Sequence, residues 1–566
     1  MTFTRPTFPE TFNLADYYLF DRLKEGLDNK VAVRFGKQRH TYRQIAEHTR
    51  NLQAFFAHRG VPRESRVLIV LHDTPAFVWA FFATLYHGAV VAMGNPEAPA
   101  EDLRYLVEYT RASAVITIPR VAEIMLPALE ASDTLRTLIV APEVATGGDV
   151  FEEVTMPAGL GGAFVAVLGQ ALAFGEKLRL EGAPPPKPTK RDDLAIWLFT
   201  SGSTGKSKAA MHTHRDFAFN TEVYAKGTVG YTRDDVTVSI PRLFFGYATG
   251  TNLMFPFAVG ATTALFAERP TPAALTEAIL RDKPTIVTNV PTMMGKLLDD
   301  DDSRRASGKP PLDFSSVRFH LSAGEALPPS LLTRFTERFK NDVYDGIGSA
   351  EMFHIYCTNR PGDIKPGSLG RVVDGYTIKI LPSEAEGPGE PELPRGETGV
   401  MWVKGDSVAL GYFQDRDKSW GTFHGHWCRT GDLFKLDDDG YLWFSGRADD
   451  LLKVGGIWVA PTEVEECLMQ HPAVSLAAVI GADDEGLTKP KAFLVLREEA
   501  RAALVDDEKA ALLAGEIKEH VKSRLSKHKY PRWIVFAEDI AKNDRGKVDK
   551  KTLKDREKRG ENPRGI

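Results

Sequence analysis

Short apolar runs alternate with longer amphipathic stretches from about residue 30 to residue 450. One run is VLIVL at residues 67–71, and GAVVAM follows at residues 88–93 after a mixed segment. Short apolar runs are typical of strands buried on both faces, and the stretches between them are typical of helices packed on a sheet. The alternation therefore predicts an α/β fold with largely buried sheets.

A second, smaller domain is expected near the C-terminus. The 566 residues are too many for a single core. The character of the sequence changes beyond Gly446, where about 120 residues remain. Helix and strand signals in this part are residues 461–465, 475–480 and 492–496 and the helix face of Leu513, Ile517, Val521 and Leu525. They indicate a small α/β domain that follows a large one.

Composition excludes several classes of protein. With 43% hydrophobic and 26% charged residues the chain is typical of a soluble globular protein. A formal net charge of −5 offers no basic excess for binding nucleic acid. Cys357, Cys428 and Cys467 are far apart in sequence, which favours a reducing cytoplasm over a disulfide framework or a zinc knuckle. The N-terminus shows no signal peptide, so we expect a cytoplasmic protein.

Four segments invite other interpretations. Residues 156–175 are uncharged for about the length of a membrane span, but a proline and five glycines favour a buried helix and loop, so no membrane partner is expected. The four aspartates at 299–302 precede arginines and predict a solvated loop. His212 and His214 are expected on one face of a strand, without a third metal ligand. Residues 555–566 are charged and expected to fray.

The segment TSGSTGKSK at residues 200–208 combines two glycines, five hydroxyl residues and two lysines. Glycines let backbone amides approach a ligand, while hydroxyls add donors and lysines add positive charge. An apolar run at 194–199 predicts a strand that anchors the loop. Residues 205–207 match the second half of a Walker loop, but Thr200 replaces its first glycine and residues 209–211 favour a second strand. We therefore predict a phosphate-binding loop outside the P-loop NTPases.

Six further segments follow this loop in order. They are residues 322–328 (SAGEALP), 345–351 (DGIGSAE), 396–400 (GETGV) with 411–413 (GYF), 429–432 (RTGD), 446–453 (GRADDLLK) and 543–547 (NDRGK). Together with the loop they resemble the AMP-forming acyl-CoA synthetase and adenylation-domain (adenylate-forming) superfamily over nearly the whole chain. One such match is weak evidence, whereas seven matches in the same order are strong evidence.

The resemblance implies that a carboxylate attacks the α-phosphate of ATP, that pyrophosphate leaves, and that the thiol of coenzyme A then takes the acyl group. ATP, Mg²⁺ and coenzyme A are the implied cofactors. Two unit charges about 4 Å apart repel by about 4 kcal/mol at an effective dielectric of about 20, so the site must neutralise its two anions. By resemblance Glu351 is the metal ligand and Lys547 the catalytic cation that bridges carboxylate and phosphate.

The implied domains are residues 1–448, an N-terminal multi-sheet α/β domain for adenylation and aryl-acid binding, and residues 449–566, a small mobile C-terminal α/β domain. Asp449 is the implied hinge between the two half-reactions. In the second orientation Lys453, with Gly455 and Gly456, replaces Lys547 and lines a channel for the coenzyme A thiol.

The implied nucleotide-binding residues lie in several of the matched segments. Those for phosphates are Thr200, Ser201, Gly202, Ser203, Thr204, Gly205 and Lys206. Those that frame the adenine are Ser322, Ala323, Gly324 and Glu325 with Asp345, Gly346, Ile347, Gly348 and Ser349. Asp432 accepts from the ribose hydroxyls, Arg447 lies near the ribose and phosphate, and Phe444 completes the nucleotide set.

Segments 243–247 (LFFGY), 345–348 and 352–355 are similar to the benzoate:CoA ligase subgroup. Aromatic residues there favour a flat slot for an aryl acid over a fatty-acid tunnel. The implied residues around the ring are Phe245, Gly246, Tyr247, Ala323, Gly324, Gly348, His354 and Ile355. Gly246 leaves space for an amino or hydroxyl substituent, as in 2-aminobenzoate or a hydroxybenzoate. His354 either donates to that substituent or is a satisfied core residue.

Two other functions stay open. One is a freestanding adenylating enzyme that loads an aryl group on a carrier-protein thiol, and the other is a non-catalytic nucleotide or aryl-acid sensor. The chain departs from the family at Ser207, Ala350 and Arg545, where proline, threonine and threonine are usual. Of the three functions, we expect an aryl-carboxylate:CoA ligase. The sequence is also compatible with a homodimer.

Replacing the implied catalytic cation tests this division of labour. Lys547→Ala should abolish acid-dependent ATP–pyrophosphate exchange, because nothing then offsets the repulsion between the two anions. Conversion of supplied aryl-adenylate to the thioester should stay largely intact. Equal loss of both half-reactions would contradict the assignment.

Overall fold

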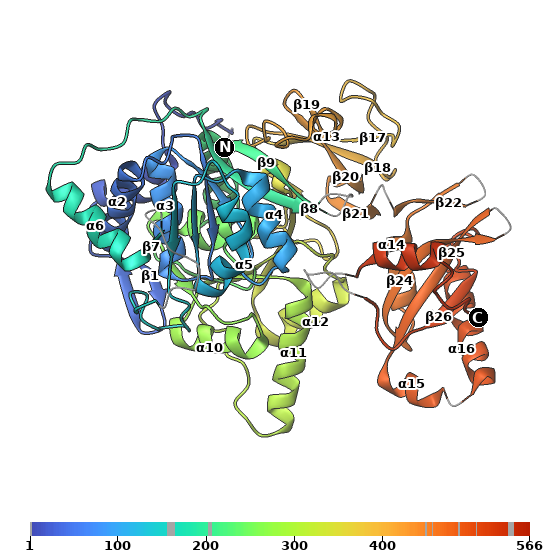
Figure 1. Cartoon of the computed structure of the whole chain (residues 1–566). Coiled ribbons are helices and arrows are strands. Elements are labelled where there is room, and N and C mark those ends of the chain that lie inside the picture. The colour runs from blue at the N-terminus through green and yellow to red at the C-terminus, as the bar shows by residue number, and fades with distance from the viewer. Residues whose placement is uncertain are drawn as a thin grey trace. The chain divides into compact units, whose positions relative to one another are not determined.

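The computed structural model describes residues 3–154, 165–201, 206–447, 450–454, 457–484, 487–504, 506–541 and 548–566. The chain divides into two compact units (Figure 1). Unit one comprises Met1–Ile378 and Val403–Cys428, and unit two comprises Lys379–Trp402 and Arg429–Ile566. Both contain helices and sheets, which confirms the predicted α/β class. The predicted hinge, Asp449, lies outside the described residues, so the boundary at 448/449 stays a prediction.

Unit one contains a seven-stranded sheet in the order β7-β6-β5-β3-β4-β8-β9. Its strands are β7 (Val165–Val167), β6 (Thr137–Val140), β5 (Ala114–Thr117), β3 (Arg66–Val70), β4 (Val90–Met93), β8 (Leu194–Ser201) and β9 (Ser207–Thr213). Every pair is parallel except β8 with β9. The predicted strands at 67–71, 88–93 and 194–199 are confirmed as β3, β4 and β8, because each apolar run is buried inside the sheet.

A nine-stranded sheet follows the order β16-β15-β14-β13-β12-β10-β11-β1-β2. Its strands are β16 (Arg371–Val372), β15 (Ile355–Thr358), β14 (Asp342–Gly348), β13 (Phe319–Ser322), β12 (Ile286–Asn289), β10 (Val236–Ser239), β11 (Thr262–Leu265), β1 (Val31–Phe35) and β2 (Gln38–Thr41). From β1 to β14 neighbouring strands run parallel, so their carboxyl ends meet at one edge. Ligands of open α/β sheets bind outside such an edge.

Helices connect and cover these strands, and η denotes a π- or 3₁₀-helical turn. They are η1 (Asp16–Phe20), α1 (Asp21–Lys24), α2 (Tyr42–His58), α3 (Pro75–His87), α4 (Ala100–Thr110), α5 (Pro119–Glu130), α6 (Leu168–Leu180), α7 (His214–Asn220), η2 (Thr221–Val229), α8 (Gly246–Thr249), η3 (Gly250–Met254), α9 (Phe255–Val259), α10 (Pro272–Asp282), α11 (Pro291–Ala306), α12 (Pro329–Phe339), η4 (Ala350–Met352) and α13 (Arg416–Thr422). Proline at the first helical position, as in α3, α10 and α11, suits a helix start because its missing N–H has no helical partner there.

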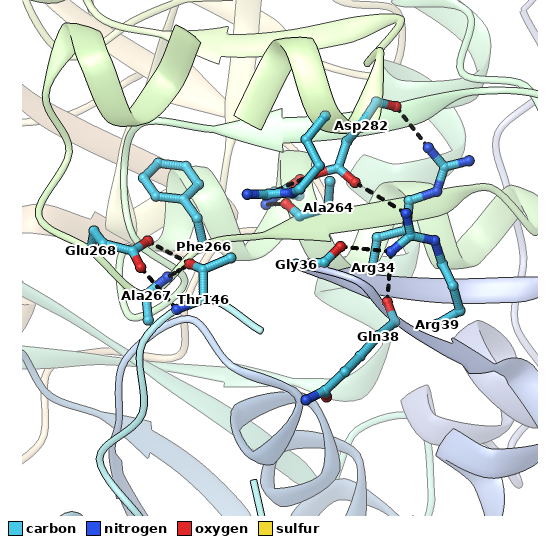
Figure 2. A network of polar contacts seen from close by, with 12 residues as sticks. Arg34, Gly36, Gln38, Arg39, Thr146, Ala264, Phe266, Ala267, Glu268 and Asp282 are labelled. Carbon is cyan, nitrogen blue, oxygen red and sulfur yellow. Dashed lines mark hydrogen bonds and ion pairs between the residues drawn. The ribbon is translucent and has the colours of Figure 1, made fainter. Parts of the chain in front are cut away.

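A seam of polar contacts joins the two sheets (Figure 2). The backbone amide of Thr146, after β6, donates to Glu268 at 2.8 Å, and the Thr146 hydroxyl donates to the same carboxylate. The Ala267 amide, after β11, donates back to that hydroxyl at 2.9 Å. The hairpin turn between β1 and β2 packs here too, since a Cβ at Gly36 would lie 2.5 Å from the Cα of Gly147. The connection therefore requires glycine at this turn.

A further five-stranded sheet has the order β17-β18-β20-β19, with β21 paired to β20. Its strands are β17 (Thr377–Leu381), β18 (Gly399–Lys404), β19 (Phe423–His424), β20 (Trp427–Leu436) and β21 (Leu442–Arg447). The strands that follow this sheet in the chain are β22 (Leu452–Val454), β23 (Ile457–Val459), β24 (Val474–Asp484), β25 (Leu487–Leu496) and β26 (Trp533–Phe536), and the helices among them are α14 (Pro461–Met469), α15 (Glu498–Ala503), α16 (Asp507–Lys522) and α17 (Lys550–Lys558), all in unit two.

The predicted elements of the C-terminal part are confirmed. Residues 461–465 open α14, 475–480 lie in β24, and 492–496 lie in β25. The predicted helix face belongs to α16, although Leu525 follows the last residue of that helix. The face packs on α14 and the three-stranded sheet β24-β25-β26, in one core whose members include Val464, Leu468, Val479, Leu494, Ile517 and Val521.

Two predictions about charged segments are wrong. Residues 299–302 are the third turn of α11, and Asp301 is fully buried instead of solvated. Its carboxylate accepts hydrogen bonds from the Leu312 amide at 2.8 Å and from Arg305 and Arg338 at 2.7 Å each. One donor from the next helical turn and two from farther along the chain thus satisfy a charge that the local sequence predicts to be hydrated.

The C-terminal segment is not frayed. Helix α17 reaches Lys558, and Ile566 exchanges two backbone hydrogen bonds with Ile534 in β26, at 2.8 and 3.0 Å. The buried Lys491 holds the same helix through Glu557, at 2.8 Å to each carboxylate oxygen. Backbone pairing with β26 therefore orders a charged tail.

Two further expectations concern histidines and a candidate membrane span. His212 lies in β9, but His214 begins α7, so the two do not share a strand face as predicted. Within 156–175, residues 156–164 lie outside the described part, and α6 starts at Leu168. Among the helices that the structure describes, none combines the length and apolarity that crossing a membrane requires.

Candidate active site

Residues predicted to frame the adenine meet at the carboxyl edge of the nine-stranded sheet. Ser322 ends β13 and is the register partner of Asp345 in the parallel strand β14. The buried Ala323 and then Gly324, whose φ is +86°, turn the chain away from the sheet. The Glu325 carboxylate accepts hydrogen bonds from the amide and the hydroxyl of Thr292, at 3.0 and 2.7 Å. The start of α11 therefore holds the side chain of Glu325.

The carboxyl group of Asp345 is an unusual feature of this edge. It is 5% exposed, and burial raises its pKa to about 7. The nearby Ser322 hydroxyl and Gly346 amide favour the charged form, which lowers the pKa and only partly offsets burial. Near neutral pH the group is therefore partly protonated and able to donate as well as accept a hydrogen bond.

Strand β14 continues into the predicted aryl-acid residues. Gly348 is the register partner of Ile355 in β15, and a Cβ at position 348 would lie 2.5 Å from the carbonyl of His354. Gly346 is equally restricted, because a Cβ there would lie 2.8 Å from the Cys357 carbonyl oxygen. Glycine at both positions lets the two strands approach closely. Gly348, His354 and Ile355 are thus brought together as the sequence predicts.

His354 stands in an aromatic wall. Its ring centroid lies 5.4 Å from that of Tyr247 and 4.7 Å from that of Phe255, and the residue is 2% exposed. Burial lowers the pKa of His354 to about 3, so the ring is neutral. Nε2 lies 2.9 Å from the Tyr247 carbonyl oxygen and must carry the proton, which leaves Nδ1 as a buried acceptor.

This tautomer changes the role expected for His354. The predicted donation to a ring substituent would need the proton that Nε2 directs to the Tyr247 carbonyl. Nδ1 offers a hydrogen-bond acceptor instead.

Gly246 begins α8, and a Cβ there would lie 3.3 Å from Leu198, so glycine leaves slightly more room than alanine would. Phe245 precedes this helix, and its ring packs on Phe244.

A buried ion pair that sequence reasoning missed holds the segment before α8. Asp73 follows β3 and is 2% exposed. One of its oxygens accepts from the Leu243 amide at 3.0 Å, and the other lies 3.5 Å from Arg242. The Arg242 guanidinium also covers the Phe266 ring, at 4.3 Å from its centroid. In the sequence, the signal for this buried ion pair is the position of Asp73 just after a predicted strand.

The phosphate loop spans the turn between two paired strands. In β8 and β9 Thr200 pairs with Lys208 and Ser201 with Ser207, which confirms the predicted second strand. Lys206 places its ammonium 5.0 Å from the centroid of Tyr105. Gly202, Ser203, Thr204 and Gly205 lie outside the described residues, and their phosphate contacts stay predictions.

The main chain around Glu351 is held by hydrogen bonds that other segments donate to its carbonyl groups. The Ala409 amide donates to the Glu351 carbonyl at 2.8 Å, and the hydroxyl of Ser407 donates to the Met352 carbonyl at 2.8 Å. His212 is fully buried, and its Nε2 donates to the Ala350 carbonyl at 2.6 Å. The sequence offers His212 only as a candidate metal ligand. In the structure it instead supports the main chain of Ala350, the residue before the predicted metal ligand Glu351.

Unit two holds the predicted ribose residues. Asp432 in β20 and Arg447 in β21 are register partners, with 3.5 Å between the Asp432 carboxylate and Nε of Arg447. Phe444 packs on Phe434 across the same strands. Lys453 is exposed in β22. Lys547, Gly455 and Gly456 lie outside the described residues, so their roles stay predictions.

Comparison with known proteins supplies the family. A model of the AMP-binding enzymes matches residues 20–413, and a model of the AMP-binding enzyme C-terminal domain matches residues 463–547. The chain belongs to the AMP-binding enzyme family. This confirms the superfamily and the adenylate-forming fold that the seven motifs predict.

Similar proteins cover the chain almost completely. Benzoate–CoA ligase of Thauera aromatica is 35% identical over 548 residues, which are 96% of each chain. A 4-hydroxybenzoate–CoA/benzoate–CoA ligase of Rhodopseudomonas palustris is 34% identical over 96% of this chain and 94% of that one. The crystal structure of the anthranilate CoA ligase AuaEII with anthranoyl-AMP superposes with a TM-score of 0.82, at 31% identity and with 97% and 98% of the chains covered.

The pKa of Asp345 makes stability depend on pH. The folded value is about 7, and an unfolded aspartate titrates near pH 4. Between these values the folded protein keeps a proton that the unfolded chain releases, so this residue's contribution to stability falls as the pH rises. The change in melting temperature from about pH 5 to about pH 8 should therefore be less negative in Asp345→Asn than in the wild type.

Asp342→Asn serves as the control, because Asp342 is exposed at the start of the same strand. It should keep the wild-type pH dependence. An Asp345→Asn profile parallel to that of the wild type would contradict the assignment.

Proposed function

We propose that this protein is an ATP-dependent aryl-carboxylate:CoA ligase, which forms an aryl-AMP intermediate and then the aryl-CoA thioester, with release of AMP and pyrophosphate. The observation that carries the proposal is the course of β14. Asp345 lies in the predicted adenine frame, and three residues later Gly348 packs on His354 in the aromatic wall. The residues predicted for the two expected ligands, a nucleotide and an aryl acid, thus lie along one strand end within unit one.

The described residues fit a divalent cation at Glu351. Its carboxylate oxygens are the hard ligands that Mg²⁺ prefers. Oε1 accepts one hydrogen bond, from Tyr412, and Oε2 accepts none from the residues that the structure describes. When bound, Mg²⁺ would neutralise phosphate charge and orient the pyrophosphate leaving group. Lys547 is proposed to provide the other positive charge, between the aryl carboxylate and the α-phosphate.

The aromatic wall favours an aryl acid that carries a donor. Nδ1 of His354 is buried without a hydrogen-bond partner among the described residues, as is the Tyr247 hydroxyl. An amino or hydroxyl group on the ring would donate to the nitrogen, whereas unsubstituted benzoate would leave it unsatisfied. We therefore propose a ring-substituted benzoate, such as 2-aminobenzoate or a hydroxybenzoate, as the preferred substrate.

A second candidate is an aryl-adenylating enzyme that loads a carrier-protein thiol, and the name of one relative supports its adenylation step. The p-hydroxybenzoic acid–AMP ligase FadD22 of Mycobacterium marinum is 29% identical over 91% of this chain and 65% of its own length. The acceptor thiol separates the two functions. A non-catalytic sensor would show neither adenylation nor transfer.

Incubation with aryl acids, ATP and Mg²⁺ tests the proposed function directly. We expect AMP to form in amounts that depend on free coenzyme A, together with the aryl-CoA thioester measured by chromatography. Pyrophosphate release followed by transfer only to a holo-carrier protein would establish the second candidate. Absence of acid-dependent ATP–pyrophosphate exchange with every aryl acid would exclude both enzymes.

The acceptor role of His354 predicts a substrate-selective effect. Glutamine can keep an amide donor near the Tyr247 carbonyl, and its one acceptor, the amide oxygen, then lies away from the position of Nδ1. In His354→Gln we expect kcat/KM for aminobenzoate or hydroxybenzoate to fall about tenfold relative to benzoate, the effect of about one hydrogen bond. Equal losses for benzoate and its substituted analogues would mean that His354 only packs the wall.

Two further parts of the proposal concern the state of the protein in the cell. A cytoplasmic location is supported by Cys357, Cys428 and Cys467, all described, buried and free of disulfides. The homodimer remains a proposal to be checked by light scattering.

A further inference from the structure

We propose that Tyr412 is a positioning residue for the metal site: its hydroxyl orients the carboxylate of Glu351. The inference rests on the proposed function, in which Glu351 holds Mg²⁺. The Tyr412 hydroxyl lies 2.7 Å from Oε1 of Glu351, and the tyrosine is 5% exposed. A tyrosine hydroxyl beside a carboxylate donates to it, so Oε1 is occupied and the carboxylate has a fixed rotation.

The backbone of Tyr412 is itself held on strand β9. The amide of Phe413 donates to the Ala209 carbonyl at 3.0 Å, and the amide of Leu410 donates to the Met211 carbonyl at 2.9 Å. Met211 in turn donates to the Gly411 carbonyl at 2.9 Å. Residues 410–413 therefore lie beside β9, with Tyr412 and Ala210 forming an isolated β-bridge, and these contacts anchor the main chain of Tyr412.

The ring of Tyr412 is also covered on one face. The ammonium of Lys208 lies 3.7 Å from the ring centroid, close enough for a cation–π interaction. Lys208 belongs to β9 and pairs with Thr200 at the end of the phosphate loop. With the lysine against this face, the ring directs its hydroxyl at Glu351. The same strand thus carries the phosphate loop and the support of the metal ligand.

Such support has a known energetic effect at metal sites. Residues that hydrogen-bond a ligating carboxylate fix its geometry, and their loss typically weakens metal affinity 10- to 100-fold. Here the backbone contacts to Ala350 and Glu351 fix the main chain, whereas Tyr412 is the described contact that fixes the side chain. Removing only the hydroxyl should therefore weaken binding of the metal complex of ATP and spare binding of AMP.

Calorimetric titration without aryl acid, so that no turnover occurs, measures this effect. In Tyr412→Phe the ring and its contact with Lys208 persist, and we expect the Kd for Mg–ATP to rise about tenfold. The Kd for AMP should change less than twofold, because AMP binding does not use the metal. A purely structural defect would weaken both ligands together.

Tyr109→Phe is the matched control. The Tyr109 hydroxyl donates to the Phe413 carbonyl at 2.7 Å and accepts from the Ala209 amide at 3.2 Å, so this variant removes the contacts of a half-buried tyrosine to the same segment and to β9 without touching Glu351. Its affinity for Mg–ATP should equal that of the wild type. Wild-type affinity of Tyr412→Phe, or an equal loss in Tyr109→Phe, would overturn the proposal.

Glu351→Gln separates failure of the inference from failure of the proposed metal role. If it weakens Mg–ATP binding and Tyr412→Phe does not, only the positioning role is wrong. If Glu351→Gln itself binds Mg–ATP normally, the metal role of Glu351 is wrong and the positioning role falls with it. In the double variant, Tyr412→Phe should add nothing to the loss caused by Glu351→Gln, because the hydroxyl acts through that carboxylate.

Discussion

Parallel pairing of β13 with β14 is the constraint on which the candidate site depends. It sets Ser322 opposite Asp345, and because the strands are parallel, both chains leave the sheet at the same edge. The continuation of β14 then turns back into β15 and brings Gly348 beside Ile355. A slip of one residue between these strands would send every side chain to the opposite face of the sheet. The residues predicted to frame the adenine and those of the aromatic wall therefore depend on one strand register.

Much of this was predictable because the relevant signals are local. Apolar runs at 67–71 and 194–199 are buried strands, since a parallel sheet covered on both faces needs continuous apolar sequence. Glycine-rich motifs mark places where strands approach closely, and a Cβ at Gly348 would collide with the carbonyl of His354. Motif order then identified the family without any knowledge of distances.

The parts that sequence did not predict are contacts between distant segments. Tyr412 reaches Glu351 across 61 residues, His212 reaches Ala350 across 138, and Leu243 reaches Asp73 across 170. Each involves a polar residue whose local surroundings give no sign of its partner. Asp301 shows the same limitation. The run of four aspartates predicts hydrated side chains, but the structure buries Asp301 in contact with Arg305 and Arg338.

These distant contacts also explain why two departures from the family motifs are compatible with the site. Ala350 lacks the usual hydroxyl, but His212 binds its backbone carbonyl, so anchoring of the chain before Glu351 does not depend on the side chain at 350. Ser207 replaces a proline, and its carbonyl accepts from the Tyr105 hydroxyl at 2.9 Å, a contact open to any residue type. In both places the structure uses main-chain atoms for position. The side chains at 207 and 350 are therefore free to vary in chemistry without loosening the scaffold, and any effect of these two departures should fall on phosphate contacts.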